Sequence, residues 1–299
     1  MSVNLQMVPS DMPTGRALAE LLESGELVYY PVCPFPLPEG KELEFLLSQK
    51  LGRFSHKNIS YDPIRDKAHG FRRRDEEQAH RLRELLADFS RIATHWLAGV
   101  LPQYASAWKL DRVSFRPLEE ATRCVRQTAR NDLLHIDAFP TRPTRGYRLL
   151  RLFVNINPTE PRVWITGERF DKLLERFGDK IGLPKTAANP GLWLRNWFLK
   201  WFGLRSRSFT PYDEFMLKLH HFLKSNDEFQ ERSFKRYWQF PPGSAWLVMT
   251  DAVCHAALRG RYALEHSYFI SPQTLALPEL SPAALLQHAV GARVVRRAA

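Results

Sequence analysis

Residues 133–157 read LLHIDAFPTRPTRGYRLLRLFVNIN, and this stretch decides the fold. It holds two short apolar segments, separated by a run that contains prolines and a glycine. Short segments rich in β-branched and aromatic residues, bounded by turn-forming residues, are typical of β-strands. The same pattern recurs from residue 112 onward in RVSFRP, TRCVRQT, RVWITG, SAWLVMTDAV, CHAALRG and ALEHSYFIS. The spacing therefore predicts an all-β barrel or sandwich at the core.

Helical patterns surround this core. Residues 75–100 carry apolar side chains at helical spacing, which predicts one long amphipathic helix with a single buried stripe. Residues 14–50 alternate, with ALAELLESGE and GKELEFLLSQKLG typical of helices and LVYYPV typical of a strand. Without an internal repeat or a low-complexity linker, the pattern predicts one domain over residues 1–299. Its expected parts are an N-terminal helical layer (1–111), the β core (112–167 and 238–275), a basic helical insertion (168–237), and a C-terminal helix with a basic tail (276–299).

Composition narrows the class of protein. The formal net charge is +11 and the sequence pI is about 9.7, a surplus that attracts nucleic acid or an anionic membrane surface. Three cysteines (Cys33, Cys124 and Cys254) form no CxxC pair, which argues against a disulfide framework or a zinc ribbon and fits a reducing cytosol. No secretory signal is visible, and no run reaches the roughly 18 apolar residues of a membrane span.

The segment His135-Ile136-Asp137 is the first candidate site. On a strand, residues i and i+2 project to one face, so an imidazole and a carboxylate converge there. A third ligand, His255 in MTDAVCHAALRG, would complete a two-histidine, one-carboxylate triad, which suits Fe(II) because it leaves coordination positions open. His266, in ALEHSYF, is the competing third ligand. No role is expected for the remaining histidines, which are His56, His69, His80, His95, His220, His221 and His288.

Two long runs carry a family resemblance. LLHIDAFPTRPTRGYRLLRLFVNINP and PPGSAWLVMTDAVCHAALRGRYALEHSYF resemble the Kdo 3-hydroxylase family, with the densest similarity in residues 112–165 and 238–271. The resemblance implies a double-stranded β-helix (cupin-like jelly roll), mostly β with helical layers. It implies hydroxylation at C3 of Kdo in Kdo2-lipid A of the lipopolysaccharide inner core, giving Ko, succinate and CO2. The implied cofactors are Fe(II) held by His135, Asp137 and His255, 2-oxoglutarate and O2, with ascorbate as the reductant.

A 2-oxoglutarate site needs a cation for the distal carboxylate, because an unpaired buried carboxylate is costly. The strand YRLLRLFVNINP offers Arg148 and Arg151, which point to opposite faces, so only one of them can enter the barrel. The choice between them stays open at this point. An arginine-rich rim also fits a substrate with carboxylates and phosphates. Its candidates are Arg116, Arg123, Arg126, Arg130, Arg142 and Arg145.

The segment GLWLRNWFLKWFGLR, residues 191–205, is unusually aromatic and contains no acid. Its tryptophans with flanking lysine and arginine are typical of a helix that lies in the headgroup layer, although a buried helix has a similar pattern. With a lipid-linked substrate, this predicts a cytoplasmic protein peripheral on the anionic inner membrane of a Gram-negative bacterium, without a nucleic-acid partner. The alternatives are a JmjC-like protein or nucleic-acid-associated hydroxylase, and a non-catalytic cupin-like binding protein.

Overall fold

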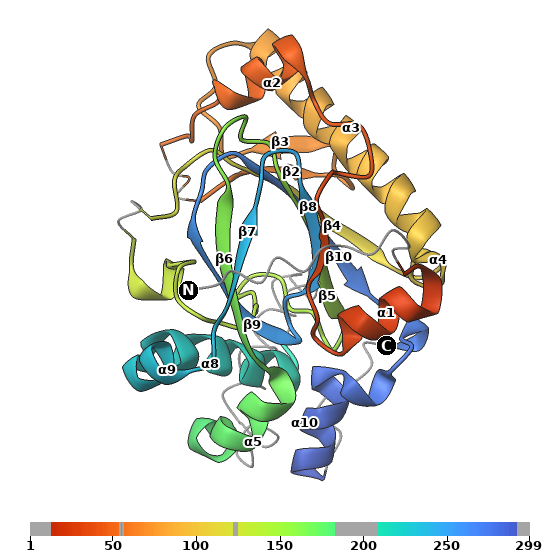
Figure 1. Cartoon of the computed structure of the whole chain (residues 1–299), viewed down its shortest axis with the longest axis vertical. Helices are drawn as coiled ribbons and strands as arrows, with labels where there is room; N and C mark the ends of the chain where they lie inside the picture. The colour runs from red at the N-terminus through yellow and green to blue at the C-terminus, as the bar shows by residue number, and fades with distance from the viewer. Residues whose placement is uncertain (1–12, 54, 56, 122–124, 183–208, 292–299) are drawn as a thin grey trace, which may run out of the picture.

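The computed structural model describes residues 13–53, 55, 57–121, 125–182 and 209–291, in which two antiparallel sheets are surrounded by helices (Figure 1). The elements are α1 (Gly15–Glu23), β1 (Val28–Tyr30), α2 (Gly40–Leu47), β2 (Ile59–Asp62), β3 (Lys67–His69), α3 (Glu76–Val100), α4 (Pro102–Ala105), β4 (Lys109–Arg116), β5 (Arg148–Asn155), β6 (Arg162–Arg169), α5 (Phe170–Ile181), α8 (Pro211–Ser225), α9 (Asp227–Arg232), β7 (Arg236–Phe240), β8 (Ala245–Met249), β9 (Val253–Arg259), β10 (Ala263–Ile270) and α10 (Pro282–Val290). The helices hold more residues than the strands, so the fold is mixed helix and antiparallel sheet, and the prediction of a mostly β chain is wrong.

The two sheets face each other. The larger has the strand order β1-β8-β5-β10-β4-β2-β3, and the smaller has the order β7-β6-β9. β5 lies inside the larger sheet, and all eight of its residues are buried. Its side chains alternate: Leu150 and Leu152 pack outward in the cluster that includes α3, whereas Phe153 packs inward against Trp164 and Trp246. One end of the space between the sheets is thus filled by aromatic rings.

Helix α3 covers the outer face of the larger sheet (Figure 1). The predicted amphipathic helix over residues 75–100 is confirmed, and Asp75 caps its first turn by accepting a hydrogen bond from the Gln78 backbone N–H. Its buried stripe is Leu82, Leu85, Leu86, Phe89, Ser90, Ala93 and Leu97. The N-terminal part of the chain is more than a helical layer, because β1, β2 and β3 all join the larger sheet.

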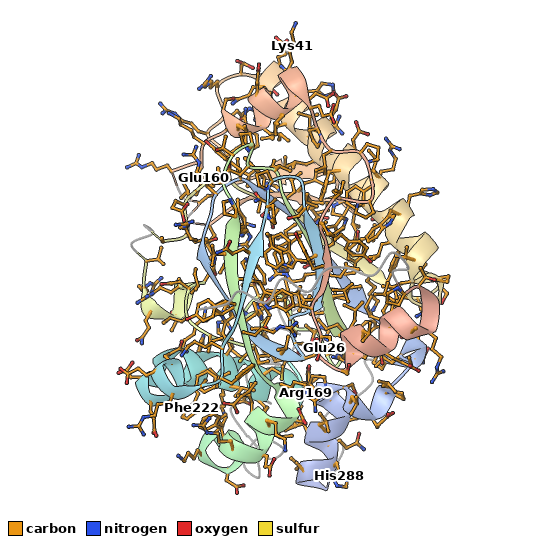
Figure 2. All side chains as sticks on the ribbon, in the orientation of Figure 1. Glu26, Lys41, Glu160, Arg169, Phe222 and His288 are labelled. Atoms are coloured by element: carbon orange, nitrogen blue, oxygen red, sulfur yellow. The ribbon has the colours of Figure 1, made fainter. Side chains whose placement is uncertain are left out.

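The predicted helical insertion contains α5, α8 and α9, which gather with α10 at one end of the molecule (Figure 1). At that end Figure 2 shows Phe222 and His288, and Lys41 projects outward at the opposite end. The aromatic segment 191–205 lies outside the described residues. Among the helices that are described, none has the length and apolar content needed to cross a membrane.

The prediction of a strand is wrong for two segments. At the end of TRCVRQT, residues 127–129 form a single 3-10 turn, and residues 122–124 are outside the described part of the chain. LLHIDAF is a loop whose only sheet-like pairing is an isolated bridge between His135 and His255. The backbone groups of this loop bind residues of β9, α8, α9 and the turn after β8 instead of one neighbouring strand, so no regular ladder can form.

Candidate metal centre

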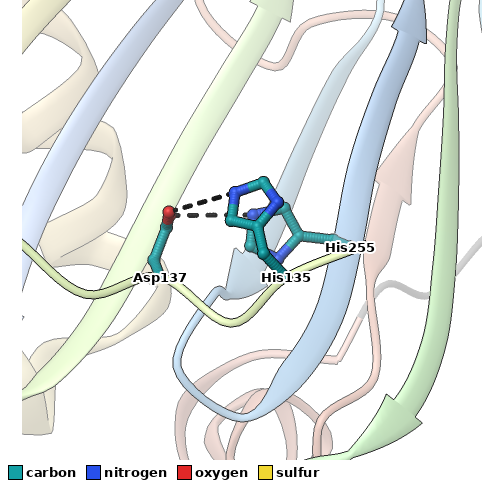
Figure 3. A group of neighbouring side chains, drawn as sticks. All are labelled: His135, Asp137 and His255. Carbon is teal, nitrogen blue, oxygen red and sulfur yellow. Dashed lines mark ion pairs between the residues drawn. The ribbon is translucent and has the colours of Figure 1, made fainter. Parts of the chain in front are cut away.

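His135, Asp137 and His255 converge at one point between the sheets (Figure 3). One ligand atom from each lies within 4.8 Å of the others. The Asp137 carboxylate is 3.5 Å from His135 Nε2 and 3.7 Å from His255 Nε2. All three side chains are buried. Two imidazoles and one carboxylate in this arrangement form the donor set that suits a divalent iron ion with open positions.

Both imidazoles are oriented by a carbonyl oxygen two residues earlier in the chain. His135 Nδ1 lies 2.7 Å from the Leu133 carbonyl oxygen, and His255 Nδ1 lies 3.2 Å from that of Val253. A carbonyl oxygen only accepts, so Nδ1 must carry the proton in each ring, and Nε2 keeps a lone pair directed toward Asp137. The Trp164 ring stacks on His255 with its centroid 5.5 Å away, which further limits rotation of this imidazole.

The charge states of the three side chains match those of metal ligands. Burial lowers the pKa of both His135 and His255, so each imidazole is neutral and free to coordinate. Burial alone would raise the pKa of Asp137, but the positive charge of Arg151 outweighs it and holds this pKa well below its usual value. The site therefore presents two neutral nitrogens and one ionised carboxylate without any rearrangement of protons.

The loop that carries His135 and Asp137 is held on both sides. His135 and His255 exchange two backbone hydrogen bonds, and the Asp137 N–H donates to the Thr250 carbonyl oxygen. From α9, the Gln230 side chain accepts from the Leu134 N–H and donates to the Leu134 carbonyl oxygen. These contacts make helical residues far along the chain part of the support for the site.

His220 also supports the loop, although no role was expected for it. Its Nδ1 lies 2.7 Å from the carbonyl oxygen of Ile136, the residue between the two ligands. Burial lowers its pKa to about 3, so the ring is neutral and donates this hydrogen bond. In the sequence His220 occupies a position on an amphipathic helix, where a histidine facing the core looks like any other buried residue.

His266, the competing third ligand, points away from the cluster. It lies on β10, where Glu265 and Ser267 face the cavity, so the alternation of the strand turns His266 toward α3. Its Nε2 is 2.7 Å from Ser90 Oγ, and its ring stacks on Tyr268. The geometry therefore excludes His266 from the three-residue cluster.

A cavity of about 220 Å³ opens onto the cluster and is rich in cations. Among the described residues that line it, six are basic and two are acidic, namely Asp137 and Glu265. Two further acids, Glu120 and Asp111, pair with these cations. The six basic residues are Lys57, Arg112, Arg116, Arg142, Arg151 and Arg162. Basic groups thus outnumber acidic ones even before a metal ion is counted, which favours an anionic ligand.

The two candidate anchors for 2-oxoglutarate lie on opposite faces of β5, as expected. Arg151 lines the cavity, donates to Asp137 Oδ2 at 2.5 Å and forms an ion pair with Glu265. Arg148 is fully buried away from the cavity lining, where its Nε donates to Asp251 at 2.8 Å. Of the two, only Arg151 can reach a ligand beside the three-residue cluster.

Arg162, on β6, lines the cavity together with Arg116, although it was not among the residues expected at the site. Arg162 is fully buried, donates to Glu120 and to the Gly260 carbonyl oxygen, and its Nε has no hydrogen-bond partner within the described chain. Arg116 binds Glu265 through two nitrogens. In the sequence, Arg162 is the basic residue at the start of the strand RVWITG, two positions before Trp164 and therefore on the same face of the strand.

The predicted basic rim is partly correct. Arg116 and Arg142 line the cavity. Arg126, Arg130 and Arg145 are not among its lining residues, and Arg123 lies outside the described residues. Arg130 is instead paired with Asp132. Sequence proximity to the two ligands in the loop was therefore a poor guide to which arginines face the site.

Comparison with known proteins agrees with this geometry. The family described as 3-deoxy-D-manno-oct-2-ulosonic acid (Kdo) hydroxylase matches residues 8–293. No curated protein matches the chain.

Solved structures of the Kdo hydroxylase KdoO, a non-heme Fe(II) α-ketoglutarate-dependent dioxygenase, are similar to it. The apo form is 36% identical with a TM-score of 0.83, over 93% of this chain and 90% of that one. The complex with α-ketoglutarate and Fe(III) is 35% identical with a TM-score of 0.83, over the same shares of 93% and 90%. The cobalt(II) complex is 35% identical with a TM-score of 0.85, over 95% and 92%. The chain therefore belongs to the Kdo hydroxylase family.

Proposed function

We propose that this protein hydroxylates C3 of Kdo in Kdo2-lipid A, in an Fe(II)- and 2-oxoglutarate-dependent reaction that gives Ko, succinate and CO2. The observation that carries the proposal is the buried cluster of His135, Asp137 and His255 at the base of a basic cavity, in a chain of this family. The three residues are the proposed iron ligands.

The residues fit an iron ion by their chemistry. Each imidazole has its Nε2 lone pair directed to the centre because its Nδ1 proton is engaged by a carbonyl oxygen. Asp137 supplies the anionic ligand, and three ligands leave positions for a bidentate co-substrate and O2. Ascorbate is the proposed reductant that keeps the iron ferrous.

The distal carboxylate of 2-oxoglutarate is proposed to bind within the arginine cluster of Arg151, Arg116 and Arg162. These three cations share two acids besides Asp137, namely Glu120 and Glu265, so one positive charge is in excess and the distal carboxylate would balance it. The unpartnered Nε of Arg162 is a second reason, because a buried donor without an acceptor is costly. Arg151 is the preferred anchor, because it alone also contacts Asp137.

The protein's own contribution is placement and charge. When bound, iron and 2-oxoglutarate supply the oxidising chemistry: one oxygen atom of O2 enters succinate and the other becomes the new sugar hydroxyl. The chain orients the ligands, neutralises the carboxylates and excludes water with Phe153 and Trp164 on the cavity wall. No side chain is required to take or give a proton at the reacting carbon.

We further propose that the two sheets form a double-stranded β-helix. Consecutive strands move between them: β5 is in the larger sheet, β6 and β7 in the smaller, β8 in the larger, β9 in the smaller and β10 in the larger. Such alternation is how a jelly roll builds two facing sheets from one chain. It also explains why ligands from a loop before β5 and from β9 meet between the sheets.

The two alternative functions are less well supported. A JmjC-like protein or nucleic-acid-associated hydroxylase shares the ligand triad but not the family match over residues 8–293. A non-catalytic binding protein has no need for two imidazoles whose tautomers are both fixed for coordination.

The test is succinate release with Fe(II), 2-oxoglutarate and Kdo2-lipid A, combined with mass spectrometry of the glycolipid product. We expect sugar-dependent succinate and a product heavier by one oxygen atom on the Kdo residue. Succinate release that does not increase when the sugar is added, or a glycolipid of unchanged mass, would contradict the proposed substrate.

We also propose that residues 191–205 bind the anionic surface of the inner membrane, so that the enzyme reaches its substrate in the leaflet. The support is compositional: three tryptophans with Arg195, Lys200 and Arg205 and no acid, where each basic residue near an anionic leaflet adds about 1 kcal/mol.

Flotation with vesicles containing anionic lipid measures this membrane binding. We expect the protein to float with anionic vesicles and not with purely zwitterionic ones. Substituting serine for Trp193, Trp197 and Trp201 together is expected to leave the protein at the bottom of the gradient. Equal flotation of this variant and the wild type would show that another surface is responsible.

A further inference from the structure

We propose that Arg112 is the binding site for the carboxylate of the acidic sugar substrate, separate from the arginines that bind 2-oxoglutarate. This inference rests on the proposed function and assigns a residue to substrate recognition. Arg112 is half-buried and lines the cavity. Within the described part of the chain its guanidinium forms no hydrogen bond or ion pair, whereas Arg116, Arg142, Arg151 and Arg162 each have an acidic partner.

Strand alternation directs this side chain toward the cavity. Arg112, Ser114 and Arg116 occupy alternate positions of β4, and all three line the cavity. Where β10 pairs with β4, His266 lies opposite Val113 and Tyr268 lies opposite Leu110, so Ser267 faces two residues, Asp111 and Arg112. This β-bulge places Asp111 beside Arg112, and Asp111 binds Arg142, a second cation that lines the cavity.

The register also places Arg112 at a suitable distance from the proposed iron ligands. Ser267 lies opposite Arg151 on the other side of β10, so Arg112 and Arg151 belong to one row across three strands. Neighbouring strands are about 4.8 Å apart, which separates the two backbones by roughly 10 Å. Arg151 contacts Asp137, so the row starts beside the proposed iron site and ends at Arg112.

The substrate has the matching geometry. The Kdo carboxylate is at C1, and C1 is joined to C3, the carbon to be hydroxylated, through C2 alone. A cation that binds this carboxylate must therefore lie close to the reacting carbon, and we assign Arg112 to it because Arg112 lines the same cavity as the proposed iron ligands. Arg116, Arg151 and Arg162 are already assigned to a dianion, Arg142 is paired with Asp111, and Lys57 donates to Asn131, so we assign Arg112 to the further carboxylate.

The test compares R112Q with the wild type on two substrates: Kdo2-lipid A, and the same glycolipid with its Kdo carboxylates converted to methyl esters. R112Q is expected to raise the KM for the acidic glycolipid about tenfold or more, with a much smaller change in the KM for 2-oxoglutarate. For the wild type, the KM for the methyl ester is expected to exceed the KM for the acidic glycolipid by a similar factor. For R112Q, the two KM values are expected to be alike, because this variant already lacks the contact between the guanidinium and the carboxylate. R112K is expected to recover part of the loss.

R91Q, which removes a charge from the exposed face of α3, is the matched control and is expected to behave as the wild type. A KM for the acidic glycolipid that is unchanged in R112Q would overturn this inference alone. An increase in the KM for 2-oxoglutarate as large as the increase in the KM for the glycolipid would also overturn this inference alone. Absence of sugar-dependent succinate in the wild type would instead overturn the proposed function.

Discussion

Replacing His135 or His255 with alanine is expected to lower sugar-dependent succinate formation by more than about a hundredfold, since loss of even an outer partner of a metal ligand costs 10–100-fold. Each substitution removes one of the three donors of the cluster, and His220, whose ring lies against that of His135, donates its Nδ1 proton to the Ile136 carbonyl oxygen and is not part of the cluster. The measurement is succinate release, paired with anaerobic Fe(II) titration of each variant.

The matched control is H266Q. His266 is buried and bound to Ser90, on the face of β10 that is turned away from the cavity. We expect H266Q to lose some thermal stability, because Ser90 loses its partner, yet to bind one Fe(II) per chain. Full iron binding by H255A together with loss of binding by H266Q would reverse the assignment of the third ligand.

The second large effect is expected for Arg151, and it distinguishes the roles of the two arginines of β5. R151Q is expected to raise the KM for 2-oxoglutarate about tenfold to a hundredfold, because a charge-assisted hydrogen bond to the distal carboxylate is lost. It also removes the cation beside Asp137, which weakens iron binding. Steady-state kinetics with varied 2-oxoglutarate, at saturating Fe(II), measures the first effect.

R148M is expected to affect stability instead. It leaves Asp251 buried without its cation, which costs about 3–5 kcal/mol in free energy of unfolding when one partner of a buried pair is removed. Thermal or urea unfolding measures this loss, and the double variant R148M/D251L is expected to recover part of it. If R148M raised the KM for 2-oxoglutarate more than R151Q does, the assignment of the anchor would be wrong.

Much of the local structure was predictable because it depends on neighbouring residues. The stripe from Leu82 to Leu97 has helical spacing, and the structure confirms one helix there. The apolar runs of β5, β8 and β10 were recognisable as strands for the same reason. The segment with His135 and Asp137 was misjudged as a strand, because its backbone partners include His255, Thr250, Gln230 and His220, all more than eighty residues away.

By itself, the sequence determined which residue types could form the site: a His-x-Asp segment, a histidine after a second apolar strand, and two arginines on opposite faces of one strand. Only the tertiary structure decided that His255 and not His266 joins the cluster, that Arg151 and not Arg148 faces the cavity, and that Arg162 and Arg112 line it. The physical reason is that strand alternation limits a side chain to one of two faces. Which face looks inward, however, depends on the register with strands distant in the chain.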